Sequence, residues 1–589
     1  MIVYALKRTS CEVEGTGLSH LKQSLRPFWG YIMLTMMIKL AGAVMELLIP
    51  YLMEVMLDVK VPAGDLNGIY ICGALMLLCA FFCLATNVIA NRMSAVSSGK
   101  ITQAIRHDLF EKLESLSAKQ MDKLTTASAV SRLTSDTYNI NQFLARTQRL
   151  GIRAPSLLIG GIIIMLSLDA TLALVLIAML PIIAVVVYLV TRTTIPLYTS
   201  VQTVLDKVVR VVQENITGIR VIKALSKTED EKKRFHSVNE ELTVTDQKAG
   251  TIAAITNPSS SLVLNLGLTV VVLVGALQVN KGDTQPGMIV AFLQYFTMIL
   301  NAMMGVTRIF VMASKGIASA NRVSSVMDLP KDLTVAEALG TEKEAPHIEF
   351  RHVSFSYTGV GENLTDLSFK LDHGQVLGIL GPTGCGKSTI LNLLMRLYDP
   401  DKGQILIDGQ DIRTMDAGRL RQKFGVVFQN DFVTEGTIAD NIRFFRDLDD
   451  AALDRAAKDA QAEFIATREG GMNAEVMVRG NNLSGGQKQR LLIARALAAN
   501  PEILILDDAS SALDYRTDAN LRRALRQNYR ETTTLLVAQR VSSLRHADLI
   551  LVLDDGCVTG AGTHDELMES CEEYRIIAQT QMGDGKEAV

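Results

Sequence analysis

The chain has 589 residues, of which 48% are hydrophobic and 21% charged, and its formal net charge is −3. This composition is too apolar for an ordinary soluble protein, and a charge so near balance gives no indication of nucleic-acid binding. The seven cysteines have neither a disulfide framework nor the spacing of zinc ligands, and residues 1–20 lack the long apolar core of a signal peptide. Because the apolar residues concentrate in the first half, that half is predicted to be a membrane domain.

Six apolar stretches in the first half are each long enough to cross a bilayer, which takes about 20 helical residues. They are Phe28–Val55, Ile69–Ala90, Ile152–Leu168, Thr171–Val190, Leu262–Val279 and Met288–Val311. The second and fourth links between them are roughly sixty residues long and carry most of the basic residues, so the positive-inside rule places these links and both termini in the cytoplasm. The sequence therefore predicts a multi-pass protein of the cytoplasmic (inner) membrane, in contact with the lipid bilayer.

The two long links are predicted to be helical. Ala104–Leu116 and Val201–Val212 repeat apolar residues at three- and four-residue spacing. Helices continued in this way project about 35–40 Å beyond the bilayer, at 1.5 Å per residue. Within the first span, Lys39 and Glu46 lie seven residues apart and share one face. Charged groups at that depth ordinarily face a cavity or a partner group, although Lys39 also has a stem long enough to snorkel to the membrane surface.

A phosphate-binding loop follows the apolar strand Val376–Leu380 and precedes an apolar-periodic helix at Ile390–Leu397. Its two spaced glycines, lysine and hydroxyl residue fit the P-loop pattern, in which backbone N–H groups and a helix N-terminus surround the phosphates of a nucleotide. The predicted binding residues are Gly381, Thr383, Gly384, Cys385, Gly386, Lys387, Ser388 and Thr389. Lys387 is expected to reach the β- and γ-phosphates, and Ser388 to hold Mg²⁺.

A second glycine-rich segment, Leu-Ser-Gly-Gly-Gln, occupies residues 483–487 and is called the signature below. Its serine, its glycines and the following helix form another anion-binding cradle. The buried-strand run Ile503–Leu506 ends at Asp507, which is expected to bind Mg²⁺ together with Ser388 and Gln429. The remaining nucleotide-binding candidates are Ser484, Gly485, Gly486, Gln487 and Asp514, with Tyr357 placed to stack on adenine.

With these motifs in this order, residues 346 to about 580 resemble the nucleotide-binding domain of an ABC transporter. Residues 20–320 resemble the membrane domain of an ABC exporter through their topology and through two short segments, Arg132–Thr137 and Glu214–Lys223. The resemblance implies a six-helix all-α transmembrane domain with long cytoplasmic helical extensions, followed by an α/β P-loop ATPase domain with a helical subdomain, and it implies ATP and Mg²⁺ as cofactors. The implied parts are a cytoplasmic N-terminal segment at 1–20, a transmembrane domain at 21–320, a linker at 321–346, a nucleotide-binding domain at 347–583 and a C-terminal tail at 584–589.

Two positions depart from the family pattern. Members ordinarily carry Glu after the Mg²⁺-binding Asp, where it polarises the attacking water, and His in a later loop, where it senses the γ-phosphate. Here the two positions hold Asp508 and Gln539. Asp withdraws the carboxylate by one methylene, roughly 1.5 Å, and Gln cannot become an imidazolium. Since general acid–base assistance is worth about 10²–10⁴-fold in rate, the sequence predicts a site that binds ATP and turns it over slowly.

In ABC dimers each ATP lies between the P-loop of one domain and the signature of the other, so the resemblance implies that this chain contributes to two sites. We expect a transport ATPase that is the degenerate-site subunit of a bacterial heterodimeric multidrug exporter. In that exporter a second half-transporter binds and hydrolyses ATP at its own P-loop, and this chain's intact signature completes that site. Amphiphilic drug-like or lipid-like molecules are the expected cargo. Val478, where exporters often have an acidic residue, is a smaller departure. Two alternatives stay open, a homodimeric lipid flippase in which Asp508 works as a base, and a nonhydrolytic nucleotide-gated regulatory subunit.

Overall fold

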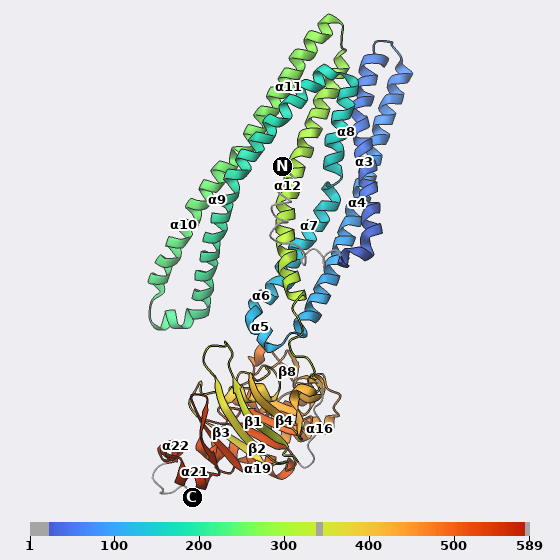
Figure 1. Ribbon diagram of the computed structural model, residues 1–589. Coiled ribbons are helices and arrows are strands. Elements are labelled where there is room, and N and C mark those ends of the chain that lie inside the picture. The colour runs from blue at the N-terminus through green and yellow to red at the C-terminus, as the bar shows by residue number, and fades with distance from the viewer. Residues whose placement is uncertain (1–22, 337–344, 583–589) are drawn as a thin grey trace. The chain divides into compact units, whose positions relative to one another are not determined.

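The structure, a computed structural model, describes residues 23–336 and 345–582 (Figure 1). The chain divides into two compact units. The first takes in the residues up to 114 together with 127–329, and the second takes in 115–126 together with the residues from 330 onward. The predicted N-terminal segment at 1–20 and the predicted tail at 584–589 lie outside the described residues, as does part of the predicted linker at 321–346.

In the first unit, bilayer-length apolar stretches form long helices, because a helix satisfies its own backbone groups where no water is present. Its elements in chain order are η1 (Arg26–Phe28), α3 (Trp29–Val55), η2 (Met56–Lys60), α4 (Leu66–Glu114), α6 (Thr126–Ser131), η3 (Arg132–Asp136), α7 (Thr137–Leu150), α8 (Arg153–Leu168), α9 (Ala170–Ala224), α10 (Thr228–Ala254), α11 (Thr256–Lys281) and α12 (Pro286–Met327). Among the described residues, 5 helical stretches are long and apolar enough to cross a membrane. The fourth predicted span, Thr171–Val190, lies within α9, whose first residues form a shorter apolar stretch at Ala170–Met179.

Two helices are far longer than a bilayer requires, α4 with 49 residues and α9 with 55. At 1.5 Å per residue they extend roughly 70–80 Å, against about 30 Å of hydrocarbon. The predicted helical character of both long links is confirmed, since α4 continues to Glu114 and α9 to Ala224.

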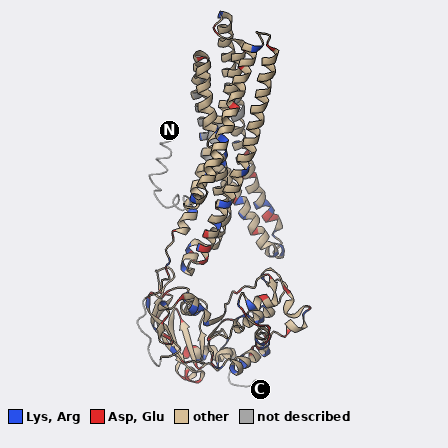
Figure 2. Cartoon of the chain, turned by 90° about the vertical axis from the view of Figure 1, so that its right-hand side faces the viewer, with Lys and Arg blue, Asp and Glu red and all other residues tan. Residues whose placement is uncertain are grey.

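Charged side chains join the extension of α9 to α10, which runs beside it (Figure 1). Lys207 pairs with Glu241 at 2.8 Å, and Arg234 of α10 pairs with Glu214 at 2.6 Å. In Figure 2 the charged residues of this unit gather toward the ends of the extensions, away from a largely uncharged stretch. This division between charged and uncharged lengths of one helix is what a membrane boundary requires.

Two aspartates organise the short links between helices. Asp58 is buried and accepts the first backbone N–H groups of α12, from Gly287 at 2.6 Å and Met288 at 2.7 Å. A carboxylate in this place satisfies free N–H groups and interacts favourably with the positive end of the helix dipole. Asp169 caps α9 and also accepts a hydrogen bond from the hydroxyl of Thr284 at 2.9 Å. Each aspartate thus ties two helices together at a turn.

The second unit is an α/β domain. It has a mainly parallel sheet in the order β12-β11-β3-β10-β9-β6, an antiparallel sheet in the order β2-β1-β4-β5, and the pair β7-β8. Its strands are β1 (Ile348–Phe355), β2 (Leu364–Leu371), β3 (Val376–Leu380), β4 (Lys402–Ile407), β5 (Gln410–Asp411), β6 (Phe424–Val427), β7 (Gly436–Thr437), β8 (Glu475–Val476), β9 (Ile503–Asp507), β10 (Thr533–Val537), β11 (Leu549–Asp554) and β12 (Cys557–Gly562). Its helices are α5 (Ala118–Leu124), α13 (Lys387–Leu394), η4 (Ile412–Thr414), α14 (Ala417–Gln422), α15 (Ile438–Arg443), α16 (Asp450–Asp459), α17 (Phe464–Thr467), η5 (Gly471–Asn473), η6 (Val478–Gly480), α18 (Gly485–Leu497), α19 (Tyr515–Asn528), α20 (Val541–Leu544), α21 (His564–Ser570) and α22 (Glu572–Met582).

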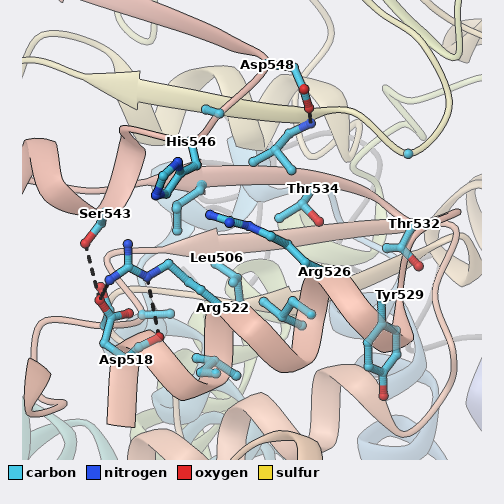
Figure 3. Close-up of a pocket in the computed structure, with 18 of the residues that line it drawn as sticks. Leu506, Asp518, Arg522, Arg526, Tyr529, Thr532, Thr534, Ser543, His546 and Asp548 are labelled. Carbon is cyan, nitrogen blue, oxygen red and sulfur yellow. Dashed lines mark hydrogen bonds and ion pairs between the residues drawn. The ribbon is translucent and has the colours of Figure 1, made fainter. Parts of the chain in front are cut away.

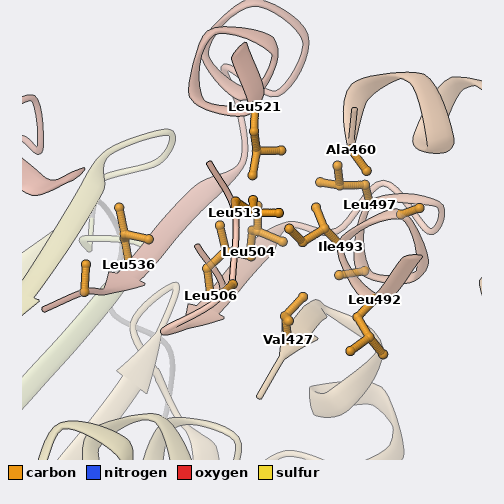
Figure 4. Close-up of a cluster of buried hydrophobic side chains, with 14 of the residues drawn as sticks. Val427, Ala460, Leu492, Ile493, Leu497, Leu504, Leu506, Leu513, Leu521 and Leu536 are labelled. Atoms are coloured by element: carbon orange, nitrogen blue, oxygen red, sulfur yellow. The ribbon is translucent and has the colours of Figure 1, made fainter. Parts of the chain in front are cut away.

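The centre of the parallel sheet is buried on both faces. Along β9, Leu504 and Leu506 pack in one apolar cluster with residues of α18 such as Ile493 (Figure 4), whereas Ile503 and Ile505 pack in a second cluster on the other face. A strand buried in this way reads as a continuous apolar run, which is why it is visible in the sequence. Because β3, β10 and β9 are parallel neighbours, their carboxyl ends meet at one edge of the sheet, where ligands of open α/β sheets bind.

The helix after the phosphate-binding loop lies three residues earlier than predicted, at Lys387–Leu394 instead of Ile390–Leu397. It begins directly after Gly386, whose φ of 104° is not helical. It ends before Arg396, whose φ of 50° cannot continue a right-handed helix.

Residues 115–126, which include α5, belong to the second unit although the surrounding chain belongs to the first. The hydroxyl of Tyr398 donates to the carboxylate of Asp122 at 2.5 Å, and the hydroxyl of Ser117 donates to Asp332 at 2.6 Å. The chain therefore enters the second unit twice, at residues 115 and 330, whereas the sequence predicted one linker between the domains, at 321–346.

Candidate functional site

The loop between β3 and α13 has the curvature that a phosphate-binding loop requires. Gly384 and Gly386 have φ values of 92° and 104°, in the left-handed region that residues with a Cβ avoid. A Cβ at Gly386 would also lie 2.8 Å from the carbonyl oxygen of Asn363. The side chain of Cys385 is buried between the two glycines and anchors the loop, while Thr383 is exposed. The free N–H groups at the start of α13 complete a cradle for an anion.

The ammonium group of Lys387 lies inside this loop. Its Nζ donates to the carbonyl oxygens of Gly381 at 2.8 Å and Pro382 at 2.7 Å. The cation is therefore held by the backbone of the same loop that forms the phosphate cradle. The loop and the lysine together fit a nucleoside triphosphate.

A hydroxyl and a carboxylate meet beside the loop. Ser388 Oγ donates to Asp507 Oδ2 at 2.9 Å, and Asp507 has only 5% of its surface exposed. Burial raises the pKa of the Asp507 carboxyl, while the hydrogen bond from Ser388 acts in the opposite direction. A hydroxyl oxygen and a carboxylate oxygen next to a phosphate cradle are hard oxygen ligands of the kind Mg²⁺ prefers. These residues therefore fit Mg²⁺, which when bound would neutralise charge on the phosphates.

The two departures from the family pattern lie in contact with each other. Gln539 Nε2 donates to Asp508 Oδ2 at 3.1 Å, although the residues are 31 positions apart. Asp508 has a φ of 51°, and its backbone N–H donates to the carbonyl oxygen of Val537 at 3.0 Å. Burial, followed by the charge of neighbouring Asp507, raises the pKa of the Asp508 carboxyl. A neutral amide thus donates a hydrogen bond to one carboxylate oxygen of Asp508, at the position where members of the family ordinarily carry Glu.

The loop that carries Gln539 is held from the C-terminal helix by a residue that sequence reasoning missed. Gln581 of α22 accepts the backbone N–H of Val541 at 2.8 Å, and its Nε2 donates to the backbone carbonyl of Gln539 at 2.8 Å. The guanidinium of Arg540, between them, lies 4.8 Å from the ring centre of Tyr515. A lone glutamine near the end of a chain belongs to no motif, so no signal in the sequence singles it out.

The signature segment begins a helix and is preformed. Ser484 caps α18 by accepting the backbone N–H of Gln487 at 3.3 Å, and the side chain of Gln487 accepts the N–H of Ser484 at 3.0 Å. Ser484 and Gly485 are exposed, so this helix N-terminus is accessible. A Cβ at Gly486 would approach the carbonyl oxygen of Ala512 to 3.1 Å, which explains a small residue there.

Asp514 caps a second helix, α19. Its carboxylate accepts the backbone N–H of Thr517 at 2.9 Å and the Thr517 hydroxyl at 2.8 Å. These hydrogen bonds hold the pKa of Asp514 below its usual range. Its position in the loop after Asp508 is therefore set by the helix it begins, and none of its recorded contacts among the described residues joins it to the P-loop.

Tyr357 lies beside α13, and Gln429 stands apart from the cluster. The Tyr357 hydroxyl receives a hydrogen bond from Asn392 at 3.2 Å and lies 3.4 Å from the hydroxyl of Thr389. Its ring meets that of Tyr398 edge to face at 5.1 Å and is 38% exposed, so it can stack on a base. Gln429 is exposed after β6, and no recorded hydrogen bond among the described residues joins it to Ser388 or Asp507.

A cavity of about 270 Å³ lies against the other side of the strand end (Figure 3). Leu506, Ala509 and Ser510 form part of its wall, and one face of α19 forms another part. Within it Arg522 donates to the carboxylate of Asp518 at 2.8 Å. The segment that carries Asp508 therefore lies between the phosphate-binding loop and this cavity.

The charged residues predicted within the first span have partner groups in the first unit. Lys39 is 4% exposed and donates to Asn87 Oδ1 at 2.6 Å, so it does not snorkel. Glu46 accepts hydrogen bonds from Arg153, the shortest at 2.8 Å. Glu46 and Arg153 also line a cavity of about 150 Å³, together with Asn301 of α12.

A nucleotide-binding α/β unit on the same chain as membrane-spanning helices defines a class, that of membrane transporters driven by a nucleotide. Comparison with known families agrees. The family described as ABC transporter transmembrane region matches residues 32–303, and the family described as ABC transporter matches residues 364–511. The chain belongs to the ABC transporter family, as an exporter-type half-transporter in which a membrane domain is fused to an ABC ATPase domain.

Individual relatives cover nearly the whole chain. The ABC transporter ATP-binding protein YfiB of Bacillus subtilis is 33% identical over 570 residues, which are 96% of this chain and 99% of YfiB. The fatty acid ABC transporter ATP-binding/permease protein of Mycobacterium tuberculosis is 33% identical over 81% of this chain and 76% of its own length. The structure of a bacterial Atm1-family ABC exporter with ATP bound superposes with a TM-score of 0.80 at 26% identity, over 96% of this chain and 99% of that one. The predicted fold class is confirmed.

Proposed function

We propose that this chain is the degenerate-site half of a heterodimeric ABC exporter, which moves amphiphilic small molecules across the cytoplasmic membrane. The observation that carries the proposal is the hydrogen bond of 3.1 Å between Gln539 and Asp508. It means that the two departures from the family pattern act in one place. The same pair of positions would otherwise supply the general base and the residue that senses the γ-phosphate.

The chemistry of this pair favours binding over turnover. A base must lie within hydrogen-bond reach of the attacking water, and the carboxylate of Asp508 is shorter than that of Glu by one methylene, roughly 1.5 Å. One of its oxygens is already engaged by an amide that cannot take a positive charge. The binding elements, Lys387 and the Ser388–Asp507 pair, keep their geometry. ATP and Mg²⁺ are therefore held at this site and hydrolysed slowly.

The intact signature supports the heterodimer. Ser484 and Gly485 are exposed at the preformed N-terminus of α18, so this chain has a functional cradle to offer to a second half-transporter. A homodimer would contain two slow sites, whereas a partner with Glu and His would complete one fast site beneath this signature. Lipid-like cargo is supported by the relative named as a fatty acid ABC transporter.

The test uses the chain alone and the chain co-purified with a second half-transporter from the same organism, both in lipid nanodiscs. The isolated chain should bind ATP and hydrolyse it very slowly. In the pair, changing the partner's catalytic Glu to Gln should abolish turnover, whereas Asp508→Asn should lower it by less than about twofold, because the base contributes little at this site. Brisk hydrolysis by the isolated chain would refute the proposal in favour of a homodimeric flippase. A pair with intact ATP binding and no hydrolysis would refute it in favour of a gating subunit.

A further inference from the structure

Three side chains meet at the edge of the second unit where the chain enters β1. His347 precedes β1, His373 lies between β2 and β3, and Asp408 lies in the turn between β4 and β5. One ring nitrogen from each histidine and one carboxylate oxygen lie within 4.8 Å of one another. Nε2 of His373 is 3.0 Å from Asp408 Oδ1, and Nε2 of His347 is 4.0 Å from the same oxygen. None of these residues belongs to the nucleotide site.

The hydrogen bonds around His347 favour one tautomer of its ring. Its Nδ1 lies 2.6 Å from Thr533 Oγ1. That hydroxyl receives the backbone N–H of Gly374 at 3.1 Å and donates its own proton to the carbonyl oxygen of Asp372 at 3.4 Å. With the hydroxyl proton directed at Asp372, Oγ1 accepts from the ring, and this arrangement favours the tautomer with the proton on Nδ1. In that tautomer Nε2 of His347 has a free lone pair.

This lone pair is buried and faces another acceptor. The side chain of His347 is 0% exposed, and its Nε2 has no hydrogen-bond partner among the described residues. The group it faces is the carboxylate of Asp408, whose other oxygen lies 3.6 Å from the ammonium of Lys423. In the tautomer with the proton on Nδ1, the nitrogen and the carboxylate are both acceptors, and a cation between them would stabilise both.

We propose that His347 Nε2, His373 Nε2 and Asp408 Oδ1 bind a divalent transition-metal ion of the Zn²⁺ class, with water as the fourth ligand. Two imidazole nitrogens and one carboxylate oxygen form a donor set that Zn²⁺ accepts. The contact with Thr533 favours the ligating tautomer of His347, as outer-shell hydrogen bonds do at metal sites.

One side chain must turn for the ion to bind. The rings of His347 and His373 stack at 3.8 Å with 13° between their planes, so their nitrogens point side by side. His373 is 64% exposed and lies in a loop, and it turns toward the oxygen it already approaches. The bound ion then links the β2–β3 loop and the β4–β5 turn to His347, the residue through which the chain enters β1.

The test measures metal binding to the full-length protein, purified metal-free with its accessible thiols alkylated. Zn²⁺ is titrated by calorimetry, and the absorption spectrum of bound Co²⁺ reports the ligands. Wild type should bind a single tight Zn²⁺ per chain. His373→Ala and Asp408→Asn should each bind it at least about tenfold more weakly, and Thr533→Val about 10–100-fold more weakly. His373 and Asp408 are partly exposed, so these variants keep their fold.

The matched control is His352→Ala. His352 also pairs with an aspartate, Asp366, at 2.7 Å, but both side chains are largely exposed and they are not part of the three-residue cluster. This variant should bind Zn²⁺ as wild type does. Equal Zn²⁺ affinity in wild type and in both His373→Ala and Asp408→Asn would overturn the proposal, as would an equal loss in His352→Ala.

Discussion

Restoring the family residues, Asp508→Glu with Gln539→His, should convert the site that we propose to be slow into a fast one. In the structure the Asp508 carboxylate is held at 3.1 Å by Gln539 Nε2. Glu adds one methylene and advances the carboxylate by roughly 1.5 Å, within reach of a water that attacks the γ-phosphate. His replaces a neutral amide with a group that can be charged. Since a positioned base is worth about 10²–10⁴-fold, the barrier should fall by about 3–5 kcal/mol.

Asp508→Glu should also lower the stability of the protein, because of the backbone conformation at residue 508. Residue 508 has a φ of 51°, in the left-handed region where Asp and Asn are several-fold enriched and longer side chains are uncommon. A left-handed conformation costs an ordinary residue about 1–2 kcal/mol. Asp508→Glu should therefore lower the free energy of unfolding by about 1 kcal/mol even while turnover rises. Asp447→Glu, the same change in an exposed loop, should alter neither quantity.

The assay compares ATP turnover and ATP affinity of wild type, each single variant, the double variant and Asp447→Glu in nanodiscs. The double variant should gain at least about 10²-fold in turnover with an ATP affinity close to wild type. Both single variants should gain much less, because the two side chains contact each other and act together. A double variant that binds ATP normally and hydrolyses it no faster than wild type would refute the assignment of the slow step to this pair.

Two further predictions concern contacts between distant residues. Gln581→Ala removes two hydrogen bonds to the loop of Gln539, about 1–3 kcal/mol in total, and should weaken ATP binding severalfold. Gln579→Ala, on the exposed side of the same helix, should leave ATP binding unchanged. Equal ATP affinities of the two variants in a nucleotide titration would show that Gln581 does not support this loop. Glu46→Leu leaves Arg153 unpaired and should lower the free energy of unfolding by about 1–3 kcal/mol. Adding Arg153→Leu should recover most of this loss, as measured by thermal unfolding. Additive losses in the double variant would show that the two residues are not coupled.

Contiguous segments of this protein were predictable because their structure depends on neighbouring residues. The curvature of the phosphate-binding loop follows from Gly384 and Gly386, whose backbone conformations other residues avoid. The cap of α18 needs only Ser484 and the side chain three positions later. The strand before Asp507 is visible as an unbroken apolar run, since both of its faces are buried. Bilayer-length helices are likewise a property of local composition.

The tertiary structure decided which distant residues meet. The Asp508–Gln539 hydrogen bond joins the ends of two parallel strands, and its existence follows from sheet order, which no local pattern encodes. Gln581 reaches the same loop from the last described helix. His347, His373 and Asp408 come from three segments and share no spacing in the sequence. The physical reason is that local motifs are set by backbone conformation, whereas these contacts are set by how strands and helices pack, which depends on the whole chain at once.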